Sequence, residues 1–179
     1  YINEVTMNHT TKCYTTGRRG GRMTSAQQKI IAELTSHEAY ILPDEFESWN
    51  DKKGPLVIEV GFGMGHSLHQ MAMQNPHENY LGIDVYTPGV ASLLKLLSSH
   101  PLPNLNVICA DAIEIVASAR PASIDRIQCY FPDPWRKKRH RKRRLFTTSF
   151  SSHVAQALKD DGYWHLITDW MDYADDLVA

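Results

Sequence analysis

Four carboxylates stand at the ends of short apolar runs, and they are the first chemical signal in the sequence. Glu59, Asp84, Asp111 and Asp133 each close or directly follow a run that has the character of a buried strand. The carboxyl ends of parallel strands meet at one edge of a sheet, so these side chains are expected to converge there. Together they predict a pocket that suits a cationic ligand.

A glycine-rich turn follows the first of these runs. Residues 56–60 lead directly into Gly61, Gly63 and Gly65, and a helical pattern comes next. Glycines permit a tight turn and let a ligand approach the backbone, although such a turn can also be purely structural. Nicotinamide cofactors, flavins and S-adenosylmethionine all use turns of this kind. The GxGxG spacing and the carboxylate of Glu59, expected at the mouth, favour S-adenosylmethionine, because a carboxylate attracts its ammonium and sulfonium and repels a pyrophosphate.

The second and third carboxylates fit an adenosine. Asp84 is placed to accept hydrogen bonds from two ribose hydroxyls, a role that NAD enzymes share. Asp111, beside Ala112, is placed to accept from the adenine amino group, or else to cap the helix that follows. These two positions indicate a nucleoside ligand without choosing its kind.

The most specific stretch joins a proline-flanked carboxylate to a basic run. In the segment Tyr-Phe-Pro-Asp-Pro-Trp, prolines fix the backbone on both sides of Asp133, and Trp135 either stacks on a base or closes the core. Eight of the nine residues from Arg136 to Arg144 are Lys or Arg. Such a run is not expected to fold onto itself, and it indicates phosphate contact or, alternatively, a nuclear-localisation signal.

The composition places this run in an otherwise acidic chain. The 179 residues, 42% of them hydrophobic, are enough for one well-packed core and predict one domain. The chain holds 19 Lys and Arg against 20 Asp and Glu, so its overall charge does not point to a nucleic acid. Outside the basic run, however, 11 basic residues face 20 acidic ones. The protein is therefore an acidic body with one strongly basic segment.

The same composition argues against several classes of protein. Cys13, Cys109 and Cys129 form no CxxC pair and no even-numbered framework, which argues against a zinc site and against a disulfide-stapled secreted domain. No apolar run approaches the roughly 18 residues of a membrane span, and the start lacks the layout of a signal peptide. We therefore expect a cytoplasmic protein with no metal site and no membrane contact.

Apolar runs alternate with helical patterns along most of the chain, which predicts a doubly wound α/β domain with a parallel sheet. Residues 1–23 are predicted to form a flexible basic arm, and a helix is predicted from Thr24 toward Pro43. Strands are predicted at 56–60, 80–84, 106–109, 124–131 and 163–168. Helices are predicted near 65–74, 88–98, 112–119 and 145–159, with a last one from about residue 170.

Three segments resemble the TrmB-type tRNA (guanine-N7-)-methyltransferases. They are residues 59–65, residues 131–135 with the basic run, and Thr168-Asp169-Trp170; Gly21-Arg22-Met23-Thr24 with Gln27 is also similar. The resemblance implies a class I S-adenosylmethionine-dependent methyltransferase, a Rossmann-like fold, over residues 24–179. It further implies S-adenosylmethionine as the methyl donor, and N7 of a guanine in the tRNA variable loop, guanine 46, as the acceptor.

The same resemblance implies particular site residues. Those implied at the cofactor are Glu59, Gly61, Gly63, Gly65, Asp84, Asp111, Ala112 and Asp133. Asp133 is also implied as catalytic, and the residues implied at the tRNA are Lys137, Arg139, Arg141 and Asp169. Two departures stand out: Asp84 occupies a position that is often Glu, and the family continues past residue 179 through a closing strand pair with a Thr-x-[Phe/Tyr]-Glu motif that is absent here.

Guanine N7 carries a lone pair and no proton, so its methylation needs no general base, and Asp133 is expected to stabilise the positive charge that develops on the purine. A non-catalytic RNA-binding protein with a vestigial nucleoside pocket is the alternative. An NAD-dependent oxidoreductase is disfavoured by the acidic mouth and by the lack of a hydride-transfer constellation. A monomer and a homodimer both remain open.

Overall fold

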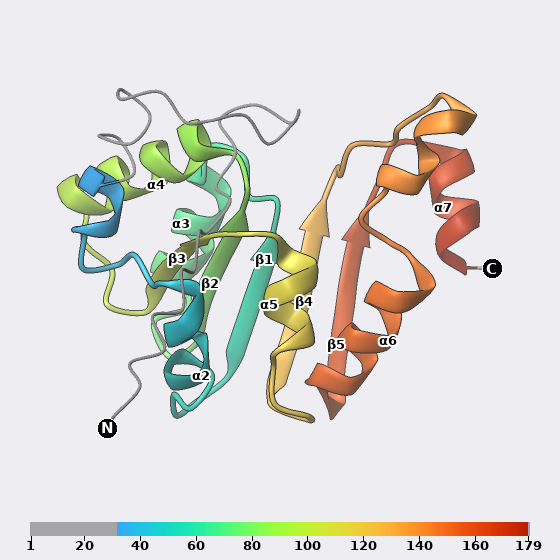
Figure 1. Cartoon of the computed structure of the whole chain (residues 1–179). Helices are drawn as coiled ribbons and strands as arrows, with labels where there is room; N and C mark the ends of the chain where they lie inside the picture. The colour runs from blue at the N-terminus through green and yellow to red at the C-terminus, as the bar shows by residue number, and fades with distance from the viewer. Residues whose placement is uncertain (1–31, 179) are drawn as a thin grey trace, which may run out of the picture.

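A five-stranded parallel sheet forms the centre of the computed structural model, which describes residues 32–178 (Figure 1). Its strands are β1 (Leu56–Val60), β2 (Asn79–Asp84), β3 (Leu105–Cys109), β4 (Ile124–Tyr130) and β5 (Leu158–Ile167), in the order β3-β2-β1-β4-β5. Successive strands are added toward one edge of the sheet from β1 to β3 and toward the other edge from β4 to β5. The strand order therefore reverses between β1 and β4, and ligands bind at such a point in open α/β sheets. The predicted doubly wound α/β class is confirmed.

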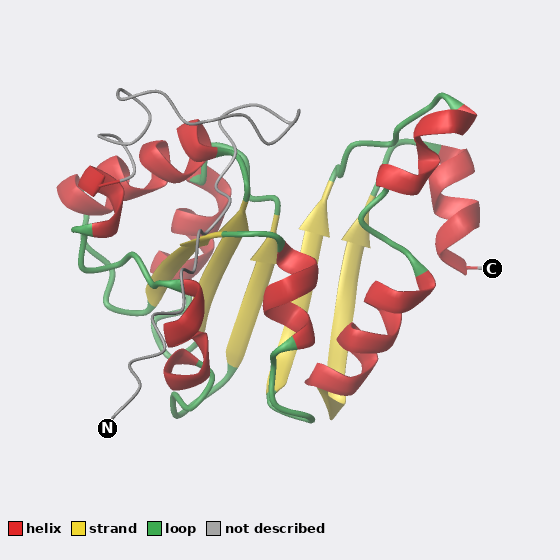
Figure 2. Ribbon diagram, in the orientation of Figure 1, coloured by secondary structure: helices red, strands yellow, loops and turns green. Residues whose placement is uncertain are grey.

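Helices cover both faces of the sheet (Figure 2). One face carries α3 (His66–Gln74) and α4 (Thr87–Ser99), which pack with Val57 and Tyr80. The other carries α2 (Phe46–Trp49), α5 (Ala112–Ala117) and α6 (Thr148–Ala157), which pack with Ile58 and Val60. The short 3-10 helix η1 (Pro43–Glu45) precedes α2, and α7 (Met171–Val178) follows β5. Every residue of β1 is buried, as is usual for a parallel strand with helices on both sides.

Two predicted elements differ from the structure. β5 begins at Leu158, five positions before the predicted start, because Leu158 pairs with Ile124 of β4. A register irregularity follows, and regular pairing resumes where Tyr163 lies opposite Arg126. The basic run, which was not expected to fold onto itself, forms the 3-10 helix η2 (Lys138–Arg143). An acidic partner on α7, described below, offsets part of its charge repulsion.

Some predictions concern residues that the structure does not describe: the arm at 1–23 and the helix start at Thr24 lie outside the described range. Cys109 is disulfide-bonded, whereas Cys129 is free and buried. The spacing of cysteines along the chain does not indicate this bond, because it carries no information about distance across a fold. Among the described residues, no helix is both long and apolar enough to cross a membrane.

Candidate functional site

A cavity of about 690 Å³ opens at the carboxyl ends of β1 to β4, where the strand order reverses. This volume lies within the roughly 300–1,000 Å³ of typical small-molecule sites. The walls come from the loops after the four strands and from the segment around η2. The predicted site residues that line the cavity are Gly61, Gly63, Asp84, Asp111, Ala112 and Asp133.

The glycine turn forms one wall of this cavity. Gly61 and Gly63 have φ angles of 72° and 60°, in the left-handed region that favours glycine. A Cβ atom on either residue would meet no other heavy atom within 4 Å, so both backbones face open space. On its other side the turn touches α4, where a Cβ on Gly89 would lie 2.1 Å from the Gly63 carbonyl oxygen. The turn therefore presents bare backbone to a ligand while α4 supports it from behind.

Gly65, the third glycine of the turn, packs against a neighbouring helix. It lies at the N-terminus of α3 with φ 81°, outside the cavity lining. A Cβ there would lie 2.7 Å from the Cβ of Leu93 on α4. The structure thus makes Gly65 a residue of close helix packing, and its place beside the cofactor stays a prediction.

Asp84 links the end of β2 to the glycine turn. Its two carboxylate oxygens accept hydrogen bonds from the backbone N–H groups of Gly63, at 3.2 Å, and Tyr86, at 2.9 Å. Burial raises the pKa of Asp84, and these two N–H groups oppose the shift. A partly desolvated carboxylate in a cavity wall is well suited to accept hydrogen bonds from hydroxyl groups.

Asp111 combines the two interpretations that the sequence left open. Its Oδ1 accepts from the Ile113 N–H at 2.9 Å, so the side chain caps α5. The residue is also exposed and lines the cavity together with Ala112. The cap uses one carboxylate oxygen and fixes the orientation of the carboxylate. The second oxygen can then accept a hydrogen bond from a ligand.

Glu59 was predicted at the mouth of the cavity, but it is buried and does not line it. Only 3% of the residue is exposed, and its Oε2 accepts a hydrogen bond of 2.7 Å from the Gln128 side chain. Successive strand residues point to opposite faces, so Val60 lines the cavity and Glu59 faces the same side as Val57, toward α3. Burial raises the pKa of Glu59 to about 6, although the bond from Gln128 opposes this.

The turn that carries Asp133 is held in an unusual backbone conformation. Asp133 is exposed and lines the cavity. Phe131 and Trp135, on either side of the Pro-Asp-Pro unit, have positive φ angles of 51° and 41°. Non-glycine residues in this region cost on the order of 1–3 kcal/mol each and concentrate at functional sites.

The basic segment divides into residues that line the cavity and residues that do not. Lys142, Arg143 and Arg144 belong to the lining, although the sequence did not single them out as site residues. The predicted tRNA contacts Lys137, Arg139 and Arg141 do not line it. Their sequence spacing gives no indication of which side chains of η2 turn toward the cavity.

Aromatic rings and a carboxylate hold this segment in place. Arg141 donates to Asp172 on α7 at 2.7 Å. The guanidinium of Arg143 lies 5.0 Å from the centroid of the Trp135 ring, and His140 meets the same ring edge-on at 6.0 Å. Trp135 therefore contacts side chains of the basic segment, and its stacking on a base stays a prediction.

Asp169 lies in the loop between β5 and α7, is exposed and does not line the cavity. The loop is ordered by neighbouring groups: the Trp170 N–H donates to the Thr168 hydroxyl at 3.2 Å, and the Arg136 guanidinium lies 4.3 Å from the Trp170 ring centroid. The contact of Asp169 with a substrate stays a prediction.

Two further observations bear on the chemistry of the cavity. Cys129 lines it, but burial first and then the charges of Glu59 and Asp84 raise the pKa of its thiol to about 12. A thiol that stays protonated is a poor nucleophile. Among residues 32–178 the structure contains no group of three His, Cys, Asp or Glu side chains arranged to hold a metal ion. The cavity therefore provides carboxylates, backbone and cations as its working groups.

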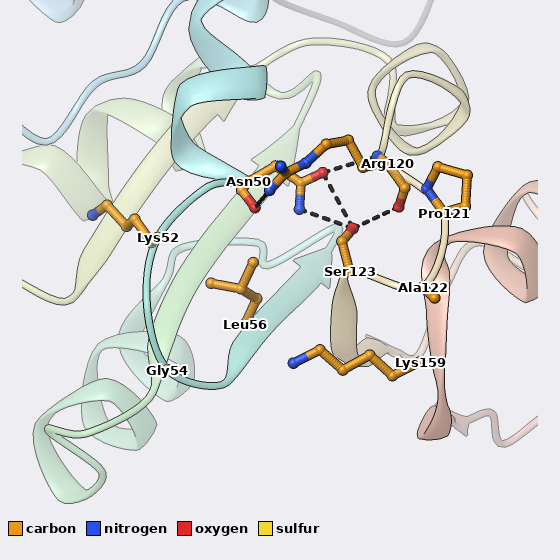
Figure 3. A pocket seen from close by; sticks show the side chains of 9 residues that line it. All are labelled: Asn50, Lys52, Gly54, Leu56, Arg120, Pro121, Ala122, Ser123 and Lys159. Atoms are coloured by element: carbon orange, nitrogen blue, oxygen red, sulfur yellow. Dashed lines mark hydrogen bonds between the residues drawn. The ribbon is translucent and has the colours of Figure 1, made fainter.

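A second hollow, of about 370 Å³, lies at the opposite end of the sheet (Figure 3). Three cations line it, and each has a partner: Lys52 donates to Asn106 at 2.8 Å, Arg120 pairs with Asp51, and Lys159 pairs with Asp125. The Ser123 hydroxyl in its wall bonds to Asn50 and to the Arg120 carbonyl. Since these groups satisfy one another, the cavity at the carboxyl ends of the strands is the better functional candidate.

The parallel sheet in this order, with a glycine turn after β1 and carboxylates at the ends of β2, β3 and β4, matches the fold of class I methyltransferases. Solved structures agree on the fold. An antibiotic-related methyltransferase superposes with a TM-score of 0.53 at 21% identity, covering 73% of this chain and 65% of its own. A SAM-dependent methyltransferase from Aquifex aeolicus superposes with a TM-score of 0.51 at 19% identity, covering 79% of this chain and 71% of its own.

Sequence comparisons are more specific. The family described as "Putative methyltransferase" matches residues 53–179. A tRNA (guanine-N(7)-)-methyltransferase from Yersinia pestis is 41% identical over 165 residues, which span 90% of this chain and 69% of the relative. The one from Hydrogenovibrio crunogenus is 41% identical over 160 residues, or 87% of this chain and 67% of the relative. The chain belongs to the tRNA (guanine-N(7)-)-methyltransferase family.

Proposed function

We propose that this protein transfers a methyl group from S-adenosylmethionine to N7 of a guanine in tRNA, guanine 46 of the variable loop. The observation that carries the proposal is the composition of one cavity. Its lining combines bare glycine backbone and two nucleoside-suited carboxylates with Asp133 and with Lys142 and Arg143 of the basic segment. Such a cavity accommodates a cationic nucleoside and an anionic nucleic acid side by side.

The residues present fit S-adenosylmethionine. The space beside Gly61 and Gly63 is open, and a side chain at either position would occupy it. Glycine leaves this space to a ligand, which can then approach the backbone closely. Asp84 would accept from the ribose hydroxyls, and Asp111 from the adenine amino group. When bound, S-adenosylmethionine supplies an electrophilic methyl group on a sulfonium. Glu59 would act indirectly, through the negative charge that it places beneath the cavity, and not by touching the ligand.

The protein's own part in the reaction is positioning and electrostatics. The N7 lone pair is nucleophilic without loss of a proton, so no residue has to act as a general base. As the methyl group is transferred, the purine becomes positively charged. Asp133 would accept hydrogen bonds from the N1–H and amino edge of the guanine and stabilise that charge where it develops. The thiol of Cys129, which its raised pKa keeps neutral, would be a poor nucleophile for covalent catalysis.

The basic segment supports RNA as the acceptor. Lys142 and Arg143 line the cavity, and Lys138 and Arg139 are exposed beside it on η2. Cations next to the reacting base neutralise the phosphates on either side of it. The guanine has to leave its stacked position to expose N7, and the cavity gives it a place to enter. The proposed location of the activity is the cytoplasm.

The test is direct. The purified protein is incubated with deuterated S-adenosylmethionine and tRNA, and the tRNA nucleosides are then separated and weighed. We expect labelled 7-methylguanosine, and none from a matched tRNA in which adenine replaces guanine 46. Cofactor binding with no transfer to either tRNA would favour the non-catalytic RNA-binding alternative. Label on another nucleoside would reject the proposed acceptor.

A further inference from the structure

Arg144 is the one Lys or Arg among residues 32–178 that is buried, with 4% of its surface exposed. Its Nε–H donates to the Pro134 carbonyl oxygen at 2.9 Å, and its Nη2 donates to Asp172 at 2.9 Å. Its guanidinium also lies 4.6 Å from the centroid of the Tyr173 ring. A buried cation with two hydrogen-bond acceptors and a ring face has a fixed orientation.

These contacts join three separate parts of the chain. Pro134 belongs to the turn that carries Asp133, Arg144 directly follows η2, and Asp172 and Tyr173 belong to α7. Tyr173 is fully buried, so α7 is anchored in the core at the point where it meets Arg144. Arg144 therefore transmits the position of a packed helix to the turn beside the cavity.

The turn has few other means of holding its shape. Pro132 and Pro134 have no N–H group to donate, and the positive φ angles of Phe131 and Trp135 store strain. At one end the Phe131 N–H donates to the Ile167 carbonyl at 2.8 Å. At the other end the bond from Arg144 to Pro134 completes the attachment. Without that bond, this end of the turn would be held by ring contacts, those of Trp135 with Arg143 and His140 and that of Arg136 with Trp170.

We propose that Arg144 is a positioning residue, which holds the Asp133 carboxylate in its working place through the Pro134 carbonyl and is itself held by Asp172 and Tyr173. The inference rests on the proposed function, because it takes Asp133 as the group that touches the guanine. Lysine cannot replace Arg144 here, since an ammonium lacks the planar fork that reaches two acceptors in different directions.

The central experiment compares Arg144→Lys with Lys138→Met in the full chain. Both variants alter the basic segment, but Lys138 is exposed. We expect Arg144→Lys to lower kcat about 10-fold to 100-fold with the KM for tRNA little changed, because a misplaced catalytic group lowers kcat by up to this amount. Lys138→Met should instead raise KM and leave kcat near its original value. A normal kcat in folded Arg144→Lys protein would overturn the proposal.

A double-mutant cycle shows whether Arg144 acts through Asp133. If it does, Arg144→Lys should lower kcat by less than about threefold further in an Asp133→Asn background. Full multiplication of the two losses would mean that Arg144 acts on the reaction independently, and would also overturn the proposal. Asp172→Asn, at a half-exposed position, loosens the same attachment from its other end and should reproduce the kcat effect more weakly.

Hydrogen exchange provides a readout that does not depend on methyl transfer. In Arg144→Lys we expect faster exchange at residues 131–137, with exchange in β1 and β2 unchanged. Faster exchange throughout the sheet would indicate a general loss of stability and reject a positioning role. If the wild-type protein methylates no guanine, the proposed function fails, while this measurement still decides whether Arg144 holds the turn.

Discussion

The side-chain amide of Gln128 on β4 donates a hydrogen bond of 2.7 Å to the carboxylate of Glu59 on β1, beneath the floor of the cavity. The neighbouring Arg126 donates to the carbonyl oxygen of the same amide at 3.0 Å. Gln128 is thereby oriented with its N–H₂ group toward Glu59. The two strands carry a buried, connected polar row where the sheet is otherwise apolar, and that row sets the electrostatics under the ligand site.

The first prediction concerns stability and pH. Glu59 has a pKa of about 6 in the folded protein against an ordinary value of 4.5. Because folding raises this pKa, the contribution of Glu59 to stability is fully present below pH 4.5 and is lost as the pH rises through 6. The difference corresponds to about 2 kcal/mol. We expect Glu59→Gln to lose less stability than wild type between pH 4.5 and 7, as measured by urea unfolding. An exposed control, Glu47→Gln, should follow wild type, and identical curves for all three would contradict the burial argument.

The second prediction separates the cap from the ligand contact at Asp111. Asn caps helices as well as Asp, but its oxygen must then accept from Ile113, which turns the NH₂ group toward the cavity. Asp111→Asn should therefore keep its melting temperature and bind S-adenosylmethionine about 1–3 kcal/mol more weakly in calorimetry. Asp111→Ala should lose about 1 kcal/mol of folding stability as well. Normal affinity in Asp111→Asn would reduce the residue to a helix cap.

The third prediction concerns the support behind the glycine turn. A Cβ at Gly89 would lie 2.1 Å from the Gly63 carbonyl oxygen, so Gly89→Ala must displace the turn or α4. In an unhindered helix the same change would stabilise by up to about 1 kcal/mol. We expect the opposite sign in thermal unfolding, together with weaker cofactor binding. Ser92→Ala on the same helix is the matched control and should show neither effect. A stabilised Gly89→Ala protein would mean that the turn yields easily.

The fourth prediction tests electrostatic catalysis. Asp133→Asn keeps the size of the side chain and one acceptor oxygen but removes the charge. If the carboxylate stabilises the purine cation, kcat should fall about 100-fold to 1,000-fold with little change in tRNA affinity. The pH-rate profile near neutrality should show no ascending limb from a general base. A lower melting temperature, with activity in proportion to the folded fraction, would instead assign Asp133 to the structure of the turn.

The fifth prediction divides the basic segment by its partners. Lys138 and Arg139 are exposed, whereas Arg141 already pairs with Asp172. Replacing Lys138 or Arg139 by Ala should each reduce the slope of log affinity against log salt for tRNA by about 1. Arg141→Ala should reduce it by less, because Asp172 competes with the phosphates for that charge. Equal slopes in all three variants would show that Asp172 releases Arg141 when RNA binds.

Much of the site was predictable from the sequence because it depends on order along the chain. Apolar runs alternating with helices require parallel strands, and parallel strands bring their carboxyl ends to one edge. Asp84, Asp111 and Asp133 meet around one cavity for that reason, and the glycine turn joins them because it follows β1 directly. The sequence could also have predicted the face on which Glu59 lies. Side chains alternate along a strand, so Glu59 shares a face with Val57 and lies opposite Val60.

The tertiary structure decided the contacts that depend on how elements pack. Arg141 and Arg144 look alike within a run of cations, yet both bond to Asp172, 31 and 28 positions away, and only Arg144 is buried and reaches Pro134. Gly65 is likewise constrained by Leu93 of α4. Local pattern determines which residues form a strand, a turn or a charged run. The position of α7 against the core determines which of these charges Asp172 neutralises. That position follows from the packing of Tyr173 and its neighbours, and the spacing of residues along the chain does not encode it.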